Sequence, residues 1–111
     1  MRNIVKQNLS KIIKTIMLNI KLLDFVDSFA ENKDVAQSLR KDQIVPALEK
    51  GSEVTLDFAG IDAATQSFVH ALISDVIRNF GNEILDKISF KNCNETVKKI
   101  IEIVVDYMQE S

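Results

Sequence analysis

The only histidine of the chain, His70, is the natural starting point in a search for catalytic chemistry. Ser67 and Ser74 lie one helical turn away on either side, and Asp75 is close in sequence. A catalytic base needs a nucleophile within hydrogen-bond reach and an acid that orients it, and this spacing alone does not provide that set. A zinc site would need further His or Cys ligands. We therefore expect an exposed histidine, no catalytic residues, no metal site and no enzymatic activity.

The residues Thr65 to Ser67 precede an apolar periodic stretch and mark the start of a helix. The first N–H groups of a helix have no partner within it, and its dipole favours negative charge there. A phosphate on Thr65 or Ser67, or a carboxylate of a partner, would be stabilised at this point. The alternative is that Thr65 or Asp62 simply caps the helix. Asp57 could cap a loop N–H or approach Ser67 to help form a site, and we favour capping.

Small side chains follow one side of this expected helix. Ser67, Ala71, Ser74 and Arg78 recur at intervals of four, three and four residues, so they share a face. Small residues would let a partner come close, and Arg78 would offer a charged anchor. We expect this outward face, together with His70 and the loop from Gly60 to Gln66, to contact a protein partner. A plain solvent-facing surface is the alternative.

The elements that would position these residues follow from periodicity. Alternation predicts strands at 16–22 and 54–58, and a third strand lies within 84–90, at about 87–90. Helical spacing predicts helices over about 33–49, 65–80 and 95–109, the first interrupted at Pro46 and the last capped by Asn94. We expect Leu56, Phe58, Phe68, Leu72, Val76, Ile88 and Val104 in one core. The order predicts a single α/β domain with a mixed sheet and helices packed against it.

Composition limits the function classes. With 111 residues, 46% hydrophobic and 27% charged, the chain has the composition of one soluble domain. A net charge of -2 argues against nucleic-acid binding, although residues 1–22 carry five basic residues and no acid. We divide the chain into a basic N-terminal arm or first element, 1–14, and a domain, 15–111. The lone Cys93 excludes an internal disulfide. We see no membrane span or signal peptide and no cofactor motif, and expect a cytoplasmic protein.

A resemblance emerges along the stretch from Ser38 to Ile61. Its most specific part, VTLDFAGI (Val54–Ile61) followed by Ser67-Phe68, resembles the STAS-like family of unknown function, which is related to bacterial anti-sigma-factor antagonists. In antagonists this loop carries an Asp-Ser-Ser-Gly motif whose serine is phosphorylated by a histidine-kinase-like ATPase. Here Thr65 replaces the Asp, Gln66 takes the phosphoacceptor position, and Phe68 replaces the Gly, while Ser67 matches the second serine.

The resemblance implies a regulatory protein-interaction module similar to anti-sigma-factor antagonists. Its partner would be a protein such as a histidine-kinase-like ATPase, bound through the loop 60–66 and the outer face of the second helix. A domain that senses a small ligand, a nucleotide or another anion is the alternative. Exposed apolar residues at Phe25, Phe29 and the last helix could also support a homodimer.

Overall fold

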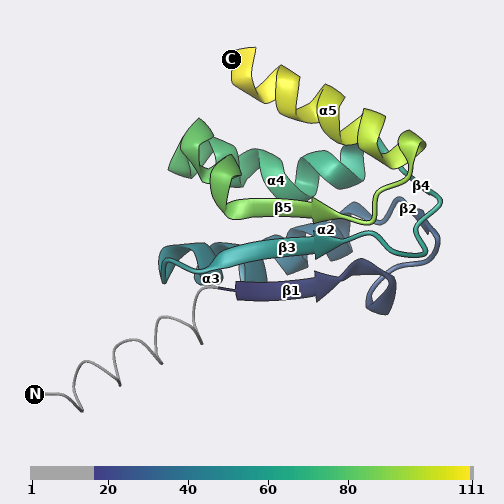
Figure 1. The fold of residues 1–111 in the computed structure, drawn as a ribbon, viewed down its shortest axis with the longest axis horizontal. Helices are drawn as coiled ribbons and strands as arrows, with labels where there is room; N and C mark the ends of the chain where they lie inside the picture. The colour runs from purple at the N-terminus through teal and green to yellow at the C-terminus, as the bar shows by residue number, and fades with distance from the viewer. Residues whose placement is uncertain (1–16, 111) are drawn as a thin grey trace, which may run out of the picture.

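Parallel strands form the central sheet of the computed structural model, which describes residues 17–110. Within these residues the sheet contains β1 (Met17–Lys21), β3 (Glu53–Asp57) and β5 (Ile88–Lys91), in the order β1-β3-β5 (Figure 1). The predicted α/β class is confirmed, but within residues 17–110 the sheet is parallel and not mixed, because β3 pairs in parallel with both neighbours. Each connection contains a helical crossover, which returns the chain to the same end of the sheet. The predicted arm of residues 1–14 lies outside the described residues.

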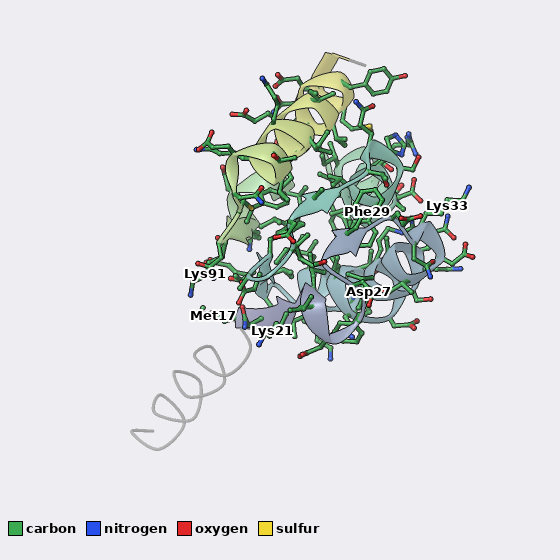
Figure 2. The ribbon with its side chains drawn as sticks, turned by 90° about the vertical axis from the view of Figure 1, so that its right-hand side faces the viewer. Met17, Lys21, Asp27, Phe29, Lys33 and Lys91 are labelled. Atoms are coloured by element: carbon green, nitrogen blue, oxygen red, sulfur yellow. The ribbon has the colours of Figure 1, made fainter. Side chains whose placement is uncertain are left out.

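The two faces of the sheet differ in polarity. In β3, Val54 and Leu56 are buried, whereas the alternating Thr55 and Asp57 are only half-buried. Side chains alternate between faces along a strand, so the apolar face is covered by helices and the other face is polar. Figure 2 shows Met17, Lys21 and Lys91 on the open side of the sheet and Lys33 of α2 on the opposite side of the domain. The functional groups described below lie on the helical side.

The first helical run is interrupted by a π-helical turn just before Pro46, at which the sequence predicted the break. It consists of α2 (Lys33–Leu39), a π-helical turn η2 (Arg40–Ile44) and α3 (Val45–Glu49). Pro46 lies in the first turn of α3, where its missing N–H costs least. Gly51 follows with a φ of 86°, and its N–H bonds to the carbonyl of Leu48. The widened turn therefore places Arg40 at the junction of two helical segments.

The second long helix, α4 (Gln66–Phe80), lies between α2 and α5 (Glu95–Glu110). Its apolar side covers the sheet, and Phe68, Leu72 and Val76 are completely buried. All seven residues predicted for the core are buried, from Leu56 and Phe58 to Val104. Within residues 17–110, no helix is both long and apolar enough to cross a membrane.

A second, two-stranded sheet holds the loop before α4 in place. The strands β2 (Phe29–Ala30) and β4 (Ala63–Ala64) pair in parallel, and Ser28 accepts from the N–H of Asp62 at 2.7 Å. Gly60, which starts this segment, has a φ of 82°, and a Cβ there would lie 2.7 Å from Leu23 Cδ2. Only glycine fits this conformation and this close approach. The sequence did not predict this second sheet.

Two 3-10 turns complete the described chain. The turn η1 (Leu22–Asp24) follows β1, and η3 (Asn82–Lys87) follows α4. The third predicted strand is therefore confirmed only from Ile88 onward. Before α5, Asn94 Oδ1 accepts from the N–H of Val97 at 2.8 Å, as expected for the predicted cap.

Candidate binding groove

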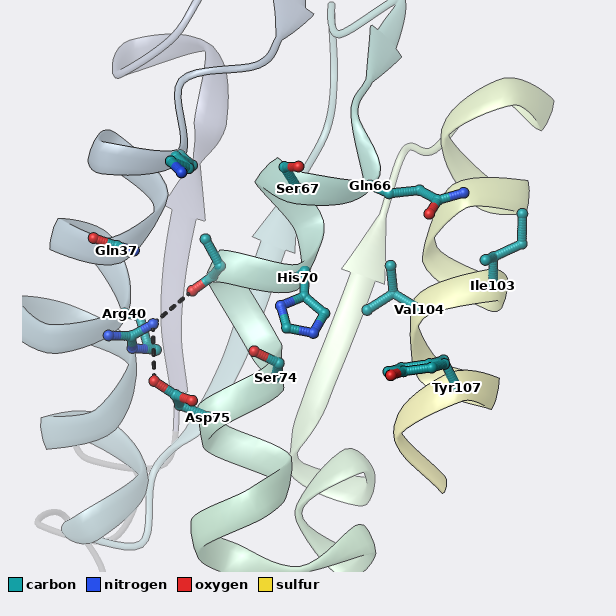
Figure 3. A pocket seen from close by; sticks show the side chains of 12 residues that line it. Gln37, Arg40, Gln66, Ser67, His70, Ser74, Asp75, Ile103, Val104 and Tyr107 are labelled. Carbon is teal, nitrogen blue, oxygen red and sulfur yellow. Dashed lines mark hydrogen bonds and ion pairs between the residues drawn. The ribbon is translucent and has the colours of Figure 1, made fainter. Parts of the chain in front are cut away.

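A groove of about 540 Å³ crosses the outer side of the helical layer, above the middle of α4 (Figure 3). One wall comes from α2 and the π-turn, the floor from α4 and the other wall from α5. We call it the α4 groove. Its lining residues, in that order, are Lys33, Gln37 and Arg40; Gln66, Ser67, His70, Ala71, Ser74 and Asp75; and Ile103, Val104 and Tyr107.

The first turn of α4 is capped by a side chain that the sequence identified. Thr65 Oγ1 accepts from the N–H of Phe68 at 3.1 Å, which satisfies one donor of the exposed helix end. Asp62, the alternative cap, instead accepts through its backbone carbonyl from Asn94 Nδ2 at 2.8 Å. Neither residue lines the groove. Ser67, one residue beyond Gln66, is exposed at the open end of the groove.

The small residues of α4 form the floor of the groove, and they do not face open solvent. Ala71 is 8% exposed and Ser74 only 3%. The prediction of an outward, solvent-facing side was therefore wrong for these two residues, because α2 and α5 pack on either flank of α4. Ser67 is exposed, and His70 is half-buried where the sequence predicted an exposed side chain. The small side chains do leave room above the helix, as the groove shows.

Arg40 is the residue of this groove that sequence reasoning missed. Its Nη1 donates to the carbonyl oxygen of Ala71 at 3.0 Å and lies 3.2 Å from Asp75 Oδ2, while only 14% of the side chain is exposed (Figure 3). The guanidinium therefore links the end of α2 to the middle of α4. A charge-assisted contact of this kind is stronger than a neutral hydrogen bond.

Arg78, which we expected to offer a charged anchor on the outward face of α4, lies at the end of that helix, away from the groove. Its side chain is 59% exposed, pairs with Asp75 at 2.6 Å and lies outside the groove lining. Asp75 therefore bridges two arginines, Arg40 on the groove side and Arg78 toward solvent. The arginine that lines the groove is Arg40 of the π-turn η2, and the expected partner contact of Arg78 stays a prediction.

Asp57 fulfils the capping role that we favoured. Its Oδ1 accepts from the N–H of Ala59 and from Asn92 Nδ2, each at 2.9 Å. The Asn92 bond, followed by the Ala59 bond, holds the pKa of Asp57 below its ordinary value, with smaller help from Lys91 and Lys21. The alternation of β3 places Asp57 on the face opposite to the helices, so it does not join Ser67 in one site.

Cys93 precedes Asn94 and α5 and is half-buried. Burial raises the pKa of its thiol above the ordinary value, and the charge of Asp57 adds to the increase, while Lys98 opposes it. A raised thiol pKa reduces the fraction of reactive thiolate at neutral pH. Partial burial and a raised pKa are the properties of a structural cysteine more than of a reactive one.

The groove combines groups suited to binding. In the described part of the chain, no hydrogen bond links His70 to Ser67 or Ser74. The same residues contain no group of three or more His, Cys, Asp or Glu that could hold a metal ion. What the groove offers is a partly apolar wall, a small-residue floor and a rim of amides and cations. Such a mixture fits a ligand surface that is itself both apolar and polar.

Comparison with known proteins identifies a family. A family model described as a STAS-like domain of unknown function (DUF4325) matches residues 35–98. The matched residues include most of the α2 wall and the whole floor of the α4 groove, but they end before Ile103 and Tyr107 on α5. Neither the search of curated proteins nor the search of solved structures gives a match.

Proposed function

The chain belongs to the family of STAS-like domains of unknown function, and we propose that it is a regulatory protein-interaction module that binds its partner in the α4 groove. The observation that carries the proposal is the pairing of a small-residue floor with exposed large side chains on one wall. Ile103 is 44% exposed and Tyr107 64%. Both stand beside the floor formed by Ala71 and Ser74.

The shape of the groove favours a helix or an extended segment of a protein over a compact ligand. Its walls are helices that run alongside α4 (Figure 3), and its lining extends along α4 from Gln66 to Asp75. Amphipathic helices bind in such grooves through apolar side chains spaced along one face. Ile103 and Tyr107 are four residues apart and therefore present a matching pair of contacts.

The rim supplies polar contacts that would fix the position of a bound segment along the groove. Gln37 and Gln66 lie on opposite sides of the groove, and Lys33 adds a positive charge at the α2 wall. Arg40 is held by Asp75 and the carbonyl of Ala71, so it can contribute a further N–H donor without moving. A polar rim around an apolar centre is the usual composition of a protein interface.

Regulation would act at the open end of the groove. Ser67 is exposed there, whereas the hydroxyl of Thr65 is engaged in the helix cap. A phosphate on Ser67 would be stabilised by the first turn of α4 and would add bulk and charge beside a bound segment. In line with the antagonist resemblance, we propose a histidine-kinase-like ATPase as the partner. The domain itself would have no catalytic turnover.

The experiment is a binding titration with a purified histidine-kinase-like ATPase from the same organism. Wild type is compared with Ser67→Arg, which places a long cation in the open end of the groove. The matched control is Asn79→Arg, an exposed position of α4 outside the groove. We expect Ser67→Arg to weaken binding at least about tenfold, a loss of about 1.4 kcal/mol. Equal binding by all three proteins would exclude the groove, and failure of wild type to bind would exclude this partner.

The presence of Lys33 and Arg40 in the lining of the α4 groove keeps anion sensing as a second candidate. Both cations border the groove, although Arg40 already has a carboxylate partner. Thermal-shift measurements with inorganic phosphate and with nucleotides distinguish the two functions. A stabilisation that saturates and is lost in Lys33→Ala would favour anion sensing.

A further inference from the structure

A second surface, at the opposite side of α2 from the groove, combines exposed aromatic side chains with acidic ones. Phe25 and Phe29 are 45% and 50% exposed, and both line a hollow of about 710 Å³ together with Leu23. Figure 2 shows Phe29 and Asp27 on the end of the domain that faces the viewer. Exposed phenylalanines that share a hollow are typical of a surface that binds another chain.

The charge of this surface is of one sign. A neighbouring hollow of about 290 Å³ shares Phe25, and neither hollow is lined by Lys or Arg. The acidic residues that line them are Asp24, Asp27, Glu31, Asp34 and Asp42. None of these carboxylates forms an ion pair within residues 17–110. We call these five residues, with Leu23, Phe25 and Phe29, the acidic aromatic patch.

We propose that the acidic aromatic patch binds the basic N-terminal arm, residues 1–14, of a second copy of this chain. The arm carries Arg2, Lys6, Lys11 and Lys14 and no acid. It also carries apolar residues, among them Ile4, Leu9 and Ile12, that the exposed phenylalanines would cover. Arm and patch are thus complementary in charge and both partly apolar.

The direction of β1 favours a second copy over the same one. Met17 begins β1 at one end of the sheet, while the patch begins beyond Lys21 at the other end (Figure 1). An arm that reached its own patch would have to turn back along β1. Residues 1–22 contain neither Gly nor Pro, the residues that tight turns favour most. Two copies that exchange arms would form a closed, symmetric dimer in which each contact occurs twice.

Complementary charge reversal tests this exchange in the full chain. One variant carries Asp27→Lys and Glu31→Lys in the patch, and the other carries Lys6→Glu and Lys11→Glu in the arm. Sedimentation equilibrium measures the oligomeric state of each variant and of an equimolar mixture. In the mixture, the two lysines introduced into the patch of one chain meet the two glutamates introduced into the arm of the other. The unaltered acidic patch of the second chain meets the unaltered basic arm of the first.

We expect wild type to form a dimer that weakens as salt is added, because the contacts are exposed to solvent. Each variant alone should dimerise at least about tenfold more weakly, and the mixture should recover a heterodimer close to wild type. The control Glu83→Lys with Asp86→Lys makes the same charge change in η3 and should leave the dimer intact. A monomeric wild type, a dimer insensitive to both variants, or a mixture that stays monomeric would each overturn the proposal.

Discussion

Replacing Arg40 by Met tests whether the buried guanidinium holds α2 against α4. Arg40→Met keeps a side chain of similar length and removes the charge. The substitution deletes the 3.0 Å bond to the Ala71 carbonyl and the 3.2 Å contact with Asp75. Neither partner is left unpaired, since Asp75 keeps Arg78 and the Ala71 carbonyl lies inside α4. Hydrogen bonds to charged groups contribute about 1.5–3 kcal/mol, so we expect a loss near the lower end, about 1–2 kcal/mol.

Arg78→Met is the matched control, because Arg78 pairs with the same carboxylate but is 59% exposed. Exposed pairs of this spacing contribute only about 0.2–0.5 kcal/mol. Urea denaturation followed by far-UV circular dichroism measures both losses as a shift of the midpoint at unchanged slope. If Arg78→Met lowers the free energy of unfolding as much as Arg40→Met or more, the conclusion that buried Arg40 holds α2 against α4 is refuted.

Two further predictions concern the floor of the α4 groove and Asp57 at the end of β3. Ala71→Arg should lower the free energy of unfolding by at least about 2 kcal/mol, because it forces a long cation into a buried site. Ser67→Arg, at an exposed site, should change the free energy of unfolding by less than about 0.5 kcal/mol. Equal losses of the two variants in urea denaturation would contradict the burial of Ala71. The lowered pKa of Asp57 means that its contribution to stability is fully present above its ordinary value of 3.8 and is lost as the pH falls through the folded value. The stability difference between wild type and Asp57→Asn should therefore shrink as the pH is lowered below 3.8, and a difference that stays constant would argue against this role.

Periodicity predicted the elements whose side chains differ strongly in polarity. The alternation of Val54, Leu56 and Phe58 identified the central strand, and the spacing of Phe68, Leu72 and Val76 identified the buried side of α4. The two-residue strands β2 and β4 were missed because they are too short to show a period. The π-turn was predicted only as an interruption, because Pro46 indicates a break without specifying its geometry.

The residues that we proposed for the site on α4 were assigned the wrong environment. Ala71 and Ser74 are small and carry little hydrophobic signal, so their burial depends on α2 and α5, which the sequence of α4 does not encode. Arg40 was missed because its partners are 31 and more residues away in the chain. Side chains that act between elements distant in sequence have no local pattern from which their role could be predicted.

The central position of β3 has a consequence for how the chain folds. Every pairing of the main sheet is non-local, since Met17 aligns with Glu53 and Val54 with Ile88. Neither β1 nor β5 has another partner within residues 17–110, so the nucleus must bring β3 together with a strand more than thirty residues away. Proteins dominated by such contacts fold more slowly than helical bundles of similar size. Among the strands of residues 17–110, β3 is the first partner of β1 to leave the ribosome, and until then the backbone groups of β1 that pair with β3 are open to association.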